Sequence, residues 1–252
     1  MTTIQEVIFC LQQITRQCKQ TSNRAGLFAA LYLRMTQAVA QGISQNFFED
    51  GSRMEQLDIV FAQRYLDAFQ SYSTTGNCQP AWKITFDACK SNDLVVFQHL
   101  LLGINTHINL DLCIAAATVA PGEKIMSLST DFNRINQLIA SLADDIQECL
   151  SQLWWPMRML TSIANGKQND VLNFSIDKAR NASWANANLL ANLPAQQYTA
   201  YVAQIDSITG TIAQGIIHPG WMKKVLLNTI RKMETKNIAD TITLLEETVV
   251  NG

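Results

Sequence analysis

One stretch of the chain sets groups capable of chemistry in an apolar background, from His99 to Asp111. On a helix, residues 99, 103, 107 and 111 form one i, i+4 ridge, so the imidazole of His107 and the carboxylate of Asp111 are neighbours one turn apart. Gly103 leaves a gap on this ridge, where a partner helix or a ligand can approach closely. Burying these polar groups is costly unless each one finds a partner.

Two kinds of chemistry suit this pair. An imidazole and a carboxylate at this spacing can share one metal ion, as in helical-bundle metal sites, or act as an acid–base pair. Asn105 and Asn109 form a second i, i+4 pair beside the ridge, and together with His99 they are candidate ligand contacts. The structural alternative is a core network in which His107 is bonded to Asp111 in one tautomer and specifies packing only.

A second polar cluster lies on the flanks of an apolar helical stripe over residues 57–69. Arg64 needs a carboxylate there, and Asp111 or Asp58 is the expected partner. Arg64 is a candidate for binding an anionic substrate group, and Tyr65 is a candidate ligand contact on the stripe. An ion pair between helices is the structural alternative for Arg64.

Two further residues are weaker candidates. Asp131 lies in the first turn of an expected helix, where an acidic side chain is favoured by the helix dipole alone, but it becomes a further metal ligand if that turn faces His107. The metal set predicted on this basis is His107, Asp111, Asp58 and Asp131. Trp184 either packs in the core or lines a ligand pocket.

Helical periodicity and cap residues recur along the chain, and strand alternation never persists. We predict one all-α domain over 1–252, a bundle of about nine or ten helices around a buried central helix near 94–118. Ser52 with Glu55 is expected to cap one helix, and Thr130 another. The expected helical ranges are 3–19, 24–41, 52–72, 82–90, 94–118, 130–156, 155–165, 169–192, 195–216, 220–233 and 236–249. Pro156 is expected to kink or end the helix that begins at 130.

Composition narrows the function classes. The 252 residues are 48% hydrophobic and only 16% charged, with a net charge of −2 and no basic run, which argues against nucleic-acid binding. The apolar run over 94–120 contains too many polar side chains for a transmembrane segment. The six cysteines form no Cys-x-x-Cys pair, and the N-terminus lacks the features of a signal peptide, so we expect a cytoplasmic protein with buried thiols.

Three segments resemble an uncharacterised family of helical proteins from bacteria and fungi, a domain of unknown function. They are Arg24–Tyr32, Arg53–Ala68 with its Phe-Ala-x-Arg-Tyr-Leu-Asp-Ala motif, and Gly103–Leu112 with its Gly-x-Asn-x-His-Ile-Asn-x-Asp-Leu motif. The resemblance spans about residues 24–190 and implies that the segment around His107 and Asp111 is the family's signature. It brings no activity with it.

Several functions follow from these residues. The first is an enzyme acting on a small or lipid-like molecule between helices, with metal-assisted hydrolysis by Zn, Fe or Mn as its most concrete form. The second is a metal-free binding protein for a hydrophobic ligand, or a cyclase or isomerase with His107 and Asp111 as its acid–base pair. The third is a purely structural helical protein. A homo-oligomer is compatible with all of them, and the substrate and the role of residues after about 190 stay open.

Overall fold

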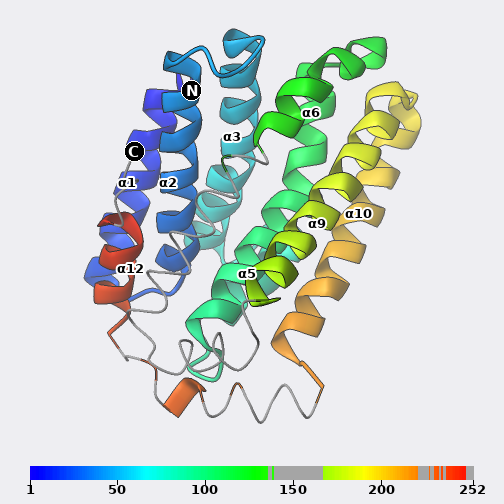
Figure 1. Cartoon of the computed structure of the whole chain (residues 1–252). Coiled ribbons are helices and arrows are strands. Elements are labelled where there is room, and N and C mark those ends of the chain that lie inside the picture. The colour runs from blue at the N-terminus through cyan, green and yellow to red at the C-terminus, as the bar shows by residue number, and fades with distance from the viewer. Residues whose placement is uncertain are drawn as a thin grey trace.

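The computed structural model describes residues 1–135, 138, 167–220, 227, 230–232, 234 and 237–247. Within these ranges every regular element is a helix, so the all-α prediction is confirmed. The long helices run side by side along the length of the molecule (Figure 1). The helix expected at 155–165, most of the one at 130–156, and most of the one at 220–233 lie outside the described residues.

The N-terminal pair of helices packs closely because small residues lie at the contact. Helices α1 (Ile4–Thr21) and α2 (Ala25–Ser44) are joined by a short turn, and α12 (Ile238–Glu247) lies beside both of them (Figure 1). A Cβ atom at Gly26 would lie 2.5 Å from Cβ of Cys18 and 2.6 Å from Cδ1 of Ile242. Glycine at this position is therefore what allows the three helices to meet.

Helix α3 (Gly51–Thr75) carries the apolar stripe that the sequence predicts, and its inward residues are buried. The predicted capping box of Ser52 with Glu55 is wrong. Asp50 caps the helix by accepting the N–H of Arg53 at 2.9 Å, while the Glu55 carboxylate accepts the N–H of Ile4 at 3.0 Å and so links α3 to α1. A carboxylate in the loop was better placed for the cap than a hydroxyl in the first turn.

The central helix is continuous from Val96 to Val119 but changes its winding in the middle. It consists of α5 (Val96–Thr106), the π-helical segment η1 (His107–Leu112) and α6 (Cys113–Val119). The helix is long and apolar enough to cross a membrane, and 78% of its most apolar window is buried within the protein. Such burial is typical of a core helix, and length and composition alone are weak evidence for a membrane span.

The other side of the bundle is formed by α9 (Lys167–Asn192) and α10 (Ala195–Ile217), with α10 along the outer edge (Figure 1). The short α4 (Pro80–Ala88) packs between α10 and α5. The 3-10 helix η2 (Gly122–Leu128) leads directly into helical residues 129–135, so the prediction that Thr130 caps a new helix is wrong. The cysteines of the described chain, Cys10, Cys18, Cys78, Cys89 and Cys113, are free thiols.

Candidate functional site

The π-helical segment η1 brings its two polar residues into direct contact. Nδ1 of His107 lies 3.0 Å from Oδ2 of Asp111, and the two residues are only 3% and 1% exposed. A π-turn inside a longer helix is rare and is frequent at functional sites. The pairing that the i, i+4 spacing predicts is therefore present, on a segment with irregular winding.

Asp111 accepts hydrogen bonds from three elements at once. The indole Nε1 of Trp82 in α4 donates to Oδ2 at 2.8 Å, and Nε of Arg64 in α3 donates to Oδ1 at 2.9 Å. The predicted partnership of Arg64 with Asp111 is thus confirmed, and Asp58 is not its partner. The Nδ1–H of a neutral imidazole can donate to this carboxyl group, which leaves Nε2 outside the bond to Asp111.

Aromatic rings surround the His107 imidazole. Phe61 stacks on it with 3.6 Å between ring centroids and 10° between planes, and Tyr32 meets it edge-on at 4.4 Å. Phe28 lies at 5.7 Å. Burial lowers the pKa of His107 although the hydrogen bond to Asp111 opposes the shift. The imidazole is therefore held in its neutral form, with a lone pair on Nε2.

The Nε2 atom of His107 is buried and has no hydrogen-bond partner in the described part of the protein. Other buried polar atoms from α2 and α3 share this condition, among them the Tyr32 hydroxyl, the Tyr65 hydroxyl and Oδ2 of Asp58. Burial, with a contribution from the charge of Glu55, raises the pKa of Asp58 to about 7. Burial raises the pKa of the Tyr32 hydroxyl well above its usual range, and the charges of Asp58 and Asp111 raise it further.

Unpartnered buried polar atoms are uncommon, because each one costs free energy. The network around Asp111 is saturated, so a purely structural role accounts well for that half of the site. A purely structural role does not explain why the Nε2 atom of His107 is buried without a partner. We call His107 and Asp111 the dyad. Its Asp111 carboxylate has hydrogen-bond partners on both oxygens, whereas its Nε2 atom has none in the described residues.

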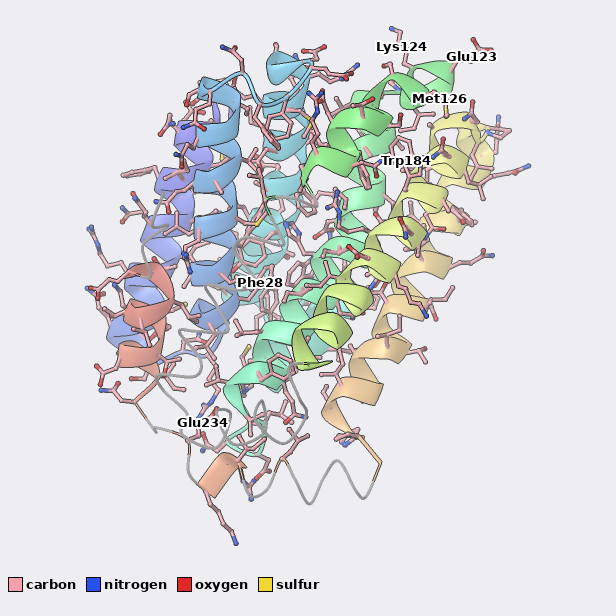
Figure 2. The ribbon with its side chains drawn as sticks, viewed as in Figure 1. Phe28, Glu123, Lys124, Met126, Trp184 and Glu234 are labelled. Atoms are coloured by element: carbon pink, nitrogen blue, oxygen red, sulfur yellow. The ribbon has the colours of Figure 1, made fainter. Side chains whose placement is uncertain are left out.

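The gap at Gly103 is filled by a partner helix rather than left for a ligand. A Cβ atom at Gly103 would lie 2.2 Å from Cγ of Phe28 in α2. The same Phe28 ring contacts His107 and lies in the middle of the bundle (Figure 2). Gly103 therefore allows α2 to come close enough to deliver Phe28 and Tyr32 to the imidazole.

The other polar residues of the ridge serve packing contacts with α10 or lie apart from the dyad. Asn105 donates to the carbonyl oxygen of Thr209 at 3.1 Å, and Asn109 donates to Oδ1 of Asn105 at 3.1 Å. His99 is 3% exposed, and neither of its ring nitrogens has a hydrogen-bond partner in the described residues. Burial, assisted by the charge of Arg24, lowers the pKa of His99 to about 4.

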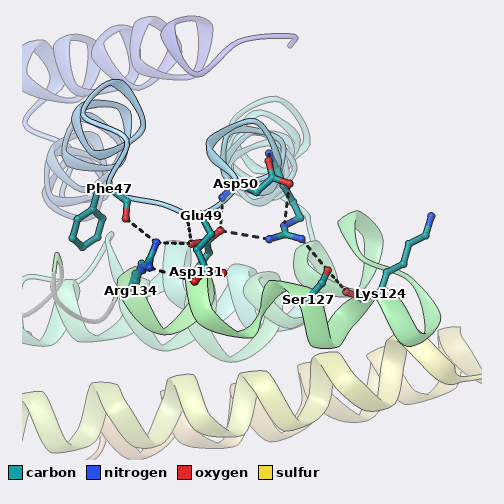
Figure 3. A network of polar contacts seen from close by, with 8 residues as sticks. Phe47, Glu49, Asp50, Lys124, Ser127, Asp131 and Arg134 are labelled. Carbon is teal, nitrogen blue, oxygen red and sulfur yellow. Dashed lines mark hydrogen bonds and ion pairs between the residues drawn. The ribbon is translucent and has the colours of Figure 1, made fainter.

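Asp131 lies in a separate polar network (Figure 3). Its carboxylate accepts the N–H groups of Glu49 and Asp50 at 2.7 and 3.0 Å, and pairs with Arg53 at 3.5 Å and Arg134 at 3.6 Å. Asp131 is fully buried and fastens the loop between α2 and α3. Its partners leave it as a structural anchor.

The predicted metal set does not come together. In the described residues, no three His, Cys, Asp or Glu side chains are grouped so that they could hold a metal ion. Asp111 is saturated by its three donors, and Asp131 belongs to the loop anchor. Trp184 packs against Phe132, with 4.7 Å between ring centroids, as a core contact between α9 and the segment after η2.

Sequence reasoning missed three side chains that contact His107 or Asp111, namely Trp82, Phe61 and Tyr32. Trp82 was detectable in principle, because a buried indole N–H requires an acceptor. Phe61 and Tyr32 carry no polar signal that distinguishes them from other core rings. Asp206 is the only charged residue of α10, and it accepts the N–H of Ala81 at 2.8 Å. Burial raises the pKa of Asp206, and its carboxylate fastens α10 to the start of α4 beside Trp82.

A comparison with protein families gives one finding. The model of a family of unknown function (DUF5995) matches residues 4–219. This range contains the dyad and all of its described contacts. No curated protein and no solved structure matches the chain.

Proposed function

The chain belongs to the DUF5995 family, a family of unknown function, and we propose its function from the site itself. The protein is an enzyme that transfers protons on a small, largely apolar molecule. The observation that carries this proposal is the unpartnered Nε2 atom of His107, on an imidazole that Asp111 fixes through Nδ1. A carboxylate that orients one ring nitrogen and leaves the other to the substrate is the general arrangement of a histidine base.

In this proposal the residues have distinct roles. His107 takes a proton at Nε2, and Asp111 is a positioning residue that fixes the tautomer and stabilises the imidazolium that forms. The Tyr32 hydroxyl and Oδ2 of Asp58 are buried without a hydrogen-bond partner in the described residues, and we assign to them the return of a proton or a hydrogen bond to a polar atom of the substrate. The low polarity created by Phe61 and Phe28 favours a substrate that is apolar over most of its surface.

Arg64 is the accessible edge of the site. Its Nε is used by Asp111, its side chain is 24% exposed, and its two Nη groups have no acceptor in the described residues. A guanidinium held at one nitrogen and open at the others binds carboxylate or phosphate groups well. We therefore expect the substrate to carry one anionic group and an apolar body, as lipid-like molecules do.

Metal-assisted hydrolysis is a second candidate. Two of the predicted ligands, His107 and Asp58, keep an unpartnered donor atom of a type that binds zinc. Elemental analysis of protein purified without an affinity tag tests this candidate. Stoichiometric zinc, iron or manganese that is lost in His107→Gln supports it, and its absence after reconstitution with each metal argues against it.

The proton-transfer proposal is tested in deuterated water. Protein and an organic-solvent extract of cellular metabolites are incubated together, and mass spectrometry follows both conversion and deuterium uptake, with and without a chelator. We expect His107→Gln to lower the rate by about 10²–10⁴-fold, because that is the usual contribution of a general base. The matched control is His99→Gln, a buried histidine on the same helix outside the dyad. Equal rates for wild type and His107→Gln would remove the proposal.

A further inference from the structure

Trp82 is fixed in place on the short helix α4, with only 1% of its surface exposed. Asp206 of α10 accepts the N–H of Ala81 in the first turn of α4 at 2.8 Å. One turn further on, the hydroxyl of Thr85 lies 2.9 Å from the hydroxyl of Thr106, the last residue of α5. These two contacts fasten α4 before and after Trp82, so the indole ring is held in one position.

The Trp82 indole and the His107 imidazole share one oxygen of Asp111. Nε1 of Trp82 lies 2.8 Å from Oδ2, and Nδ1 of His107 lies 3.0 Å from the same atom. The indole N–H can donate but cannot accept, and the same is true of the guanidinium of Arg64, which donates to Oδ1 at 2.9 Å. Each oxygen of Asp111 therefore holds one donor that cannot take a proton from it.

The proton between His107 and Asp111 has two possible places. If it is on Nδ1, the neutral imidazole has a bare Nε2. If it is on Asp111, the imidazole accepts at Nδ1 and must carry its own proton on Nε2. A hydrogen bond to the charged form of a group favours that form, so the N–H groups of Trp82 and Arg64 favour the carboxylate and with it the proton on Nδ1.

We propose that Trp82 is a positioning residue of the dyad, whose indole N–H occupies a lone pair of Oδ2 and thereby keeps Nε2 of His107 free of a proton. This role rests on the proposed function, because a bare Nε2 matters only if His107 is the base. Phe86 and Phe28 pack against Trp82 with 5.2 and 5.8 Å between ring centroids. Another apolar ring would serve that packing, whereas the N–H is what only an indole adds.

Removing the N–H returns a lone pair to Oδ2 and raises its affinity for a proton. Asp111 then takes the shared proton and leaves a neutral imidazole with its proton on Nε2, or it stabilises an imidazolium that is protonated on both nitrogens. Both routes place a proton on Nε2. The loss of one hydrogen bond to a charged group changes such an equilibrium by about tenfold or more. A role in packing alone predicts no change in the protonation of the ring.

The test replaces Trp82 by benzothienylalanine, which has the shape of tryptophan with a sulfur in place of the N–H. Amber suppression introduces it into protein labelled with ¹⁵N-histidine, and NMR follows Nε2 of His107 from about pH 5 to 8, a range that brackets the titration of a free imidazole. We expect the pH at which Nε2 takes up its proton to rise by about one unit or more, which is a tenfold change. Fluorotryptophan at the same position keeps the N–H and is the matched control, which should behave like wild type.

Trp82→Phe is a second variant without the N–H, and its control is Trp184→Phe, which changes an indole packed against Phe132 away from Asp111. The other charged or titratable groups beside the imidazole in the described residues are Arg64, Tyr32 and Tyr65, and all four variants leave them unchanged. Circular dichroism shows whether each variant keeps its helices. The benzothienylalanine variant fills the space that phenylalanine leaves, so the test does not depend on Trp82→Phe being folded.

A benzothienylalanine variant whose Nε2 stays bare over the same pH range as in wild type overturns the role of Trp82. A wild type whose Nε2 is already protonated at pH 6.5 overturns it as well. The NMR comparison needs no substrate, so it is decided separately from the proposed function, which equal rates for wild type and His107→Gln would remove. Where conversion is observed, the benzothienylalanine variant should be about tenfold slower than the fluorotryptophan variant at pH 6.5, because less of its His107 can act as a base.

Discussion

Asp111 has more partners than any other side chain at the site, and this sets the state of the residue beside it. Three side chains converge on its two oxygens from α3, α4 and the π-segment. His107 must then present Nδ1–H to Asp111 and a bare Nε2 to the aromatic surroundings. Whether this arrangement exists in solution can be determined before any substrate is known.

Histidine ring nitrogens report their protonation directly by NMR, and this chain has only three histidines. In protein labelled with ¹⁵N-histidine, we expect His107 to be the neutral tautomer with its proton on Nδ1. It should stay neutral at pH 6.5, where a free imidazole is half protonated, because burial lowers its pKa. His107→Gln assigns the signals, and Asp111→Asn should disturb the tautomer. A His107 ring protonated on both nitrogens at pH 6.5 would contradict the expected state.

At the scale of helices, the features that could be predicted are those determined by residues close together in the sequence. The apolar stripe on α3 follows from the spacing of neighbouring residues, and the structure has it. The Arg64–Asp111 pair was predictable because a half-buried guanidinium beside an apolar stripe requires a carboxylate and few were available. The π-winding of η1 was not predictable, because no local signal in its sequence marks it. Its polar side chains contact Tyr32, Arg64 and Trp82, which lie far away in sequence.

Gly103 illustrates the same limit. Its missing side chain indicates a close approach, but only the structure identifies Phe28, 75 residues earlier, as the group that approaches. The alternatives of helix and ligand were therefore open from the sequence. The Asp131 anchor is a similar case, since its carboxylate serves loop N–H groups more than 80 residues away.

Substituting Gly103 tests how tightly α2 and α5 are packed. Alanine normally stabilises a helix interior relative to glycine by up to about 1 kcal/mol. At Gly103 we expect the opposite, a loss of about 1–3 kcal/mol in the free energy of unfolding, because the new methyl group overlaps the Phe28 ring. The control is Gly215→Ala in α10, where a Cβ atom meets nothing and a small gain is expected. Urea unfolding at low protein concentration measures both, and a stabilising Gly103→Ala would refute the close contact.

At the scale of the whole molecule, the dyad lies where two hydrophobic clusters meet. One cluster contains Phe28, Tyr32 and Tyr65, the other contains Leu57 and Leu110, and Phe61 packs against both. Several ionisable groups are buried in this fold, and their pKa shifts have opposite consequences for stability. Burial raises the pKa of Asp58 to about 7, so the stabilisation that its protonated carboxyl gives the folded protein is fully present at acid pH. Burial lowers the pKa of His99 to about 4, so the stabilisation that its neutral imidazole gives the folded protein is lost as the pH falls from 6.5 toward 4.

The Asp58 carboxyl should therefore govern part of the pH dependence of folding. A carboxyl whose pKa rises from 3.8 to about 7 on folding stabilises the protein below pH 3.8, and this stabilisation is lost as the pH rises through 7. At pH 8 the folded protein must hold a buried charge that the unfolded chain exposes to water. Asp58→Asn removes this cost, so we expect the variant to be more stable than wild type at pH 8, by at most about 4 kcal/mol. The advantage should shrink steadily on acidification and vanish near pH 4.

Urea unfolding at several pH values between 4 and 8 gives the required differences. The control is Asp93→Asn, which changes an 85% exposed carboxylate that pairs with Arg231 at the surface and should not gain stability at pH 8. An Asp58→Asn variant that is less stable than wild type at pH 8 would mean that the carboxylate has a favourable partner in the folded protein. Asp58 would then be part of a satisfied network, and the unsatisfied side of the site would consist of Nε2 and the tyrosine hydroxyls alone.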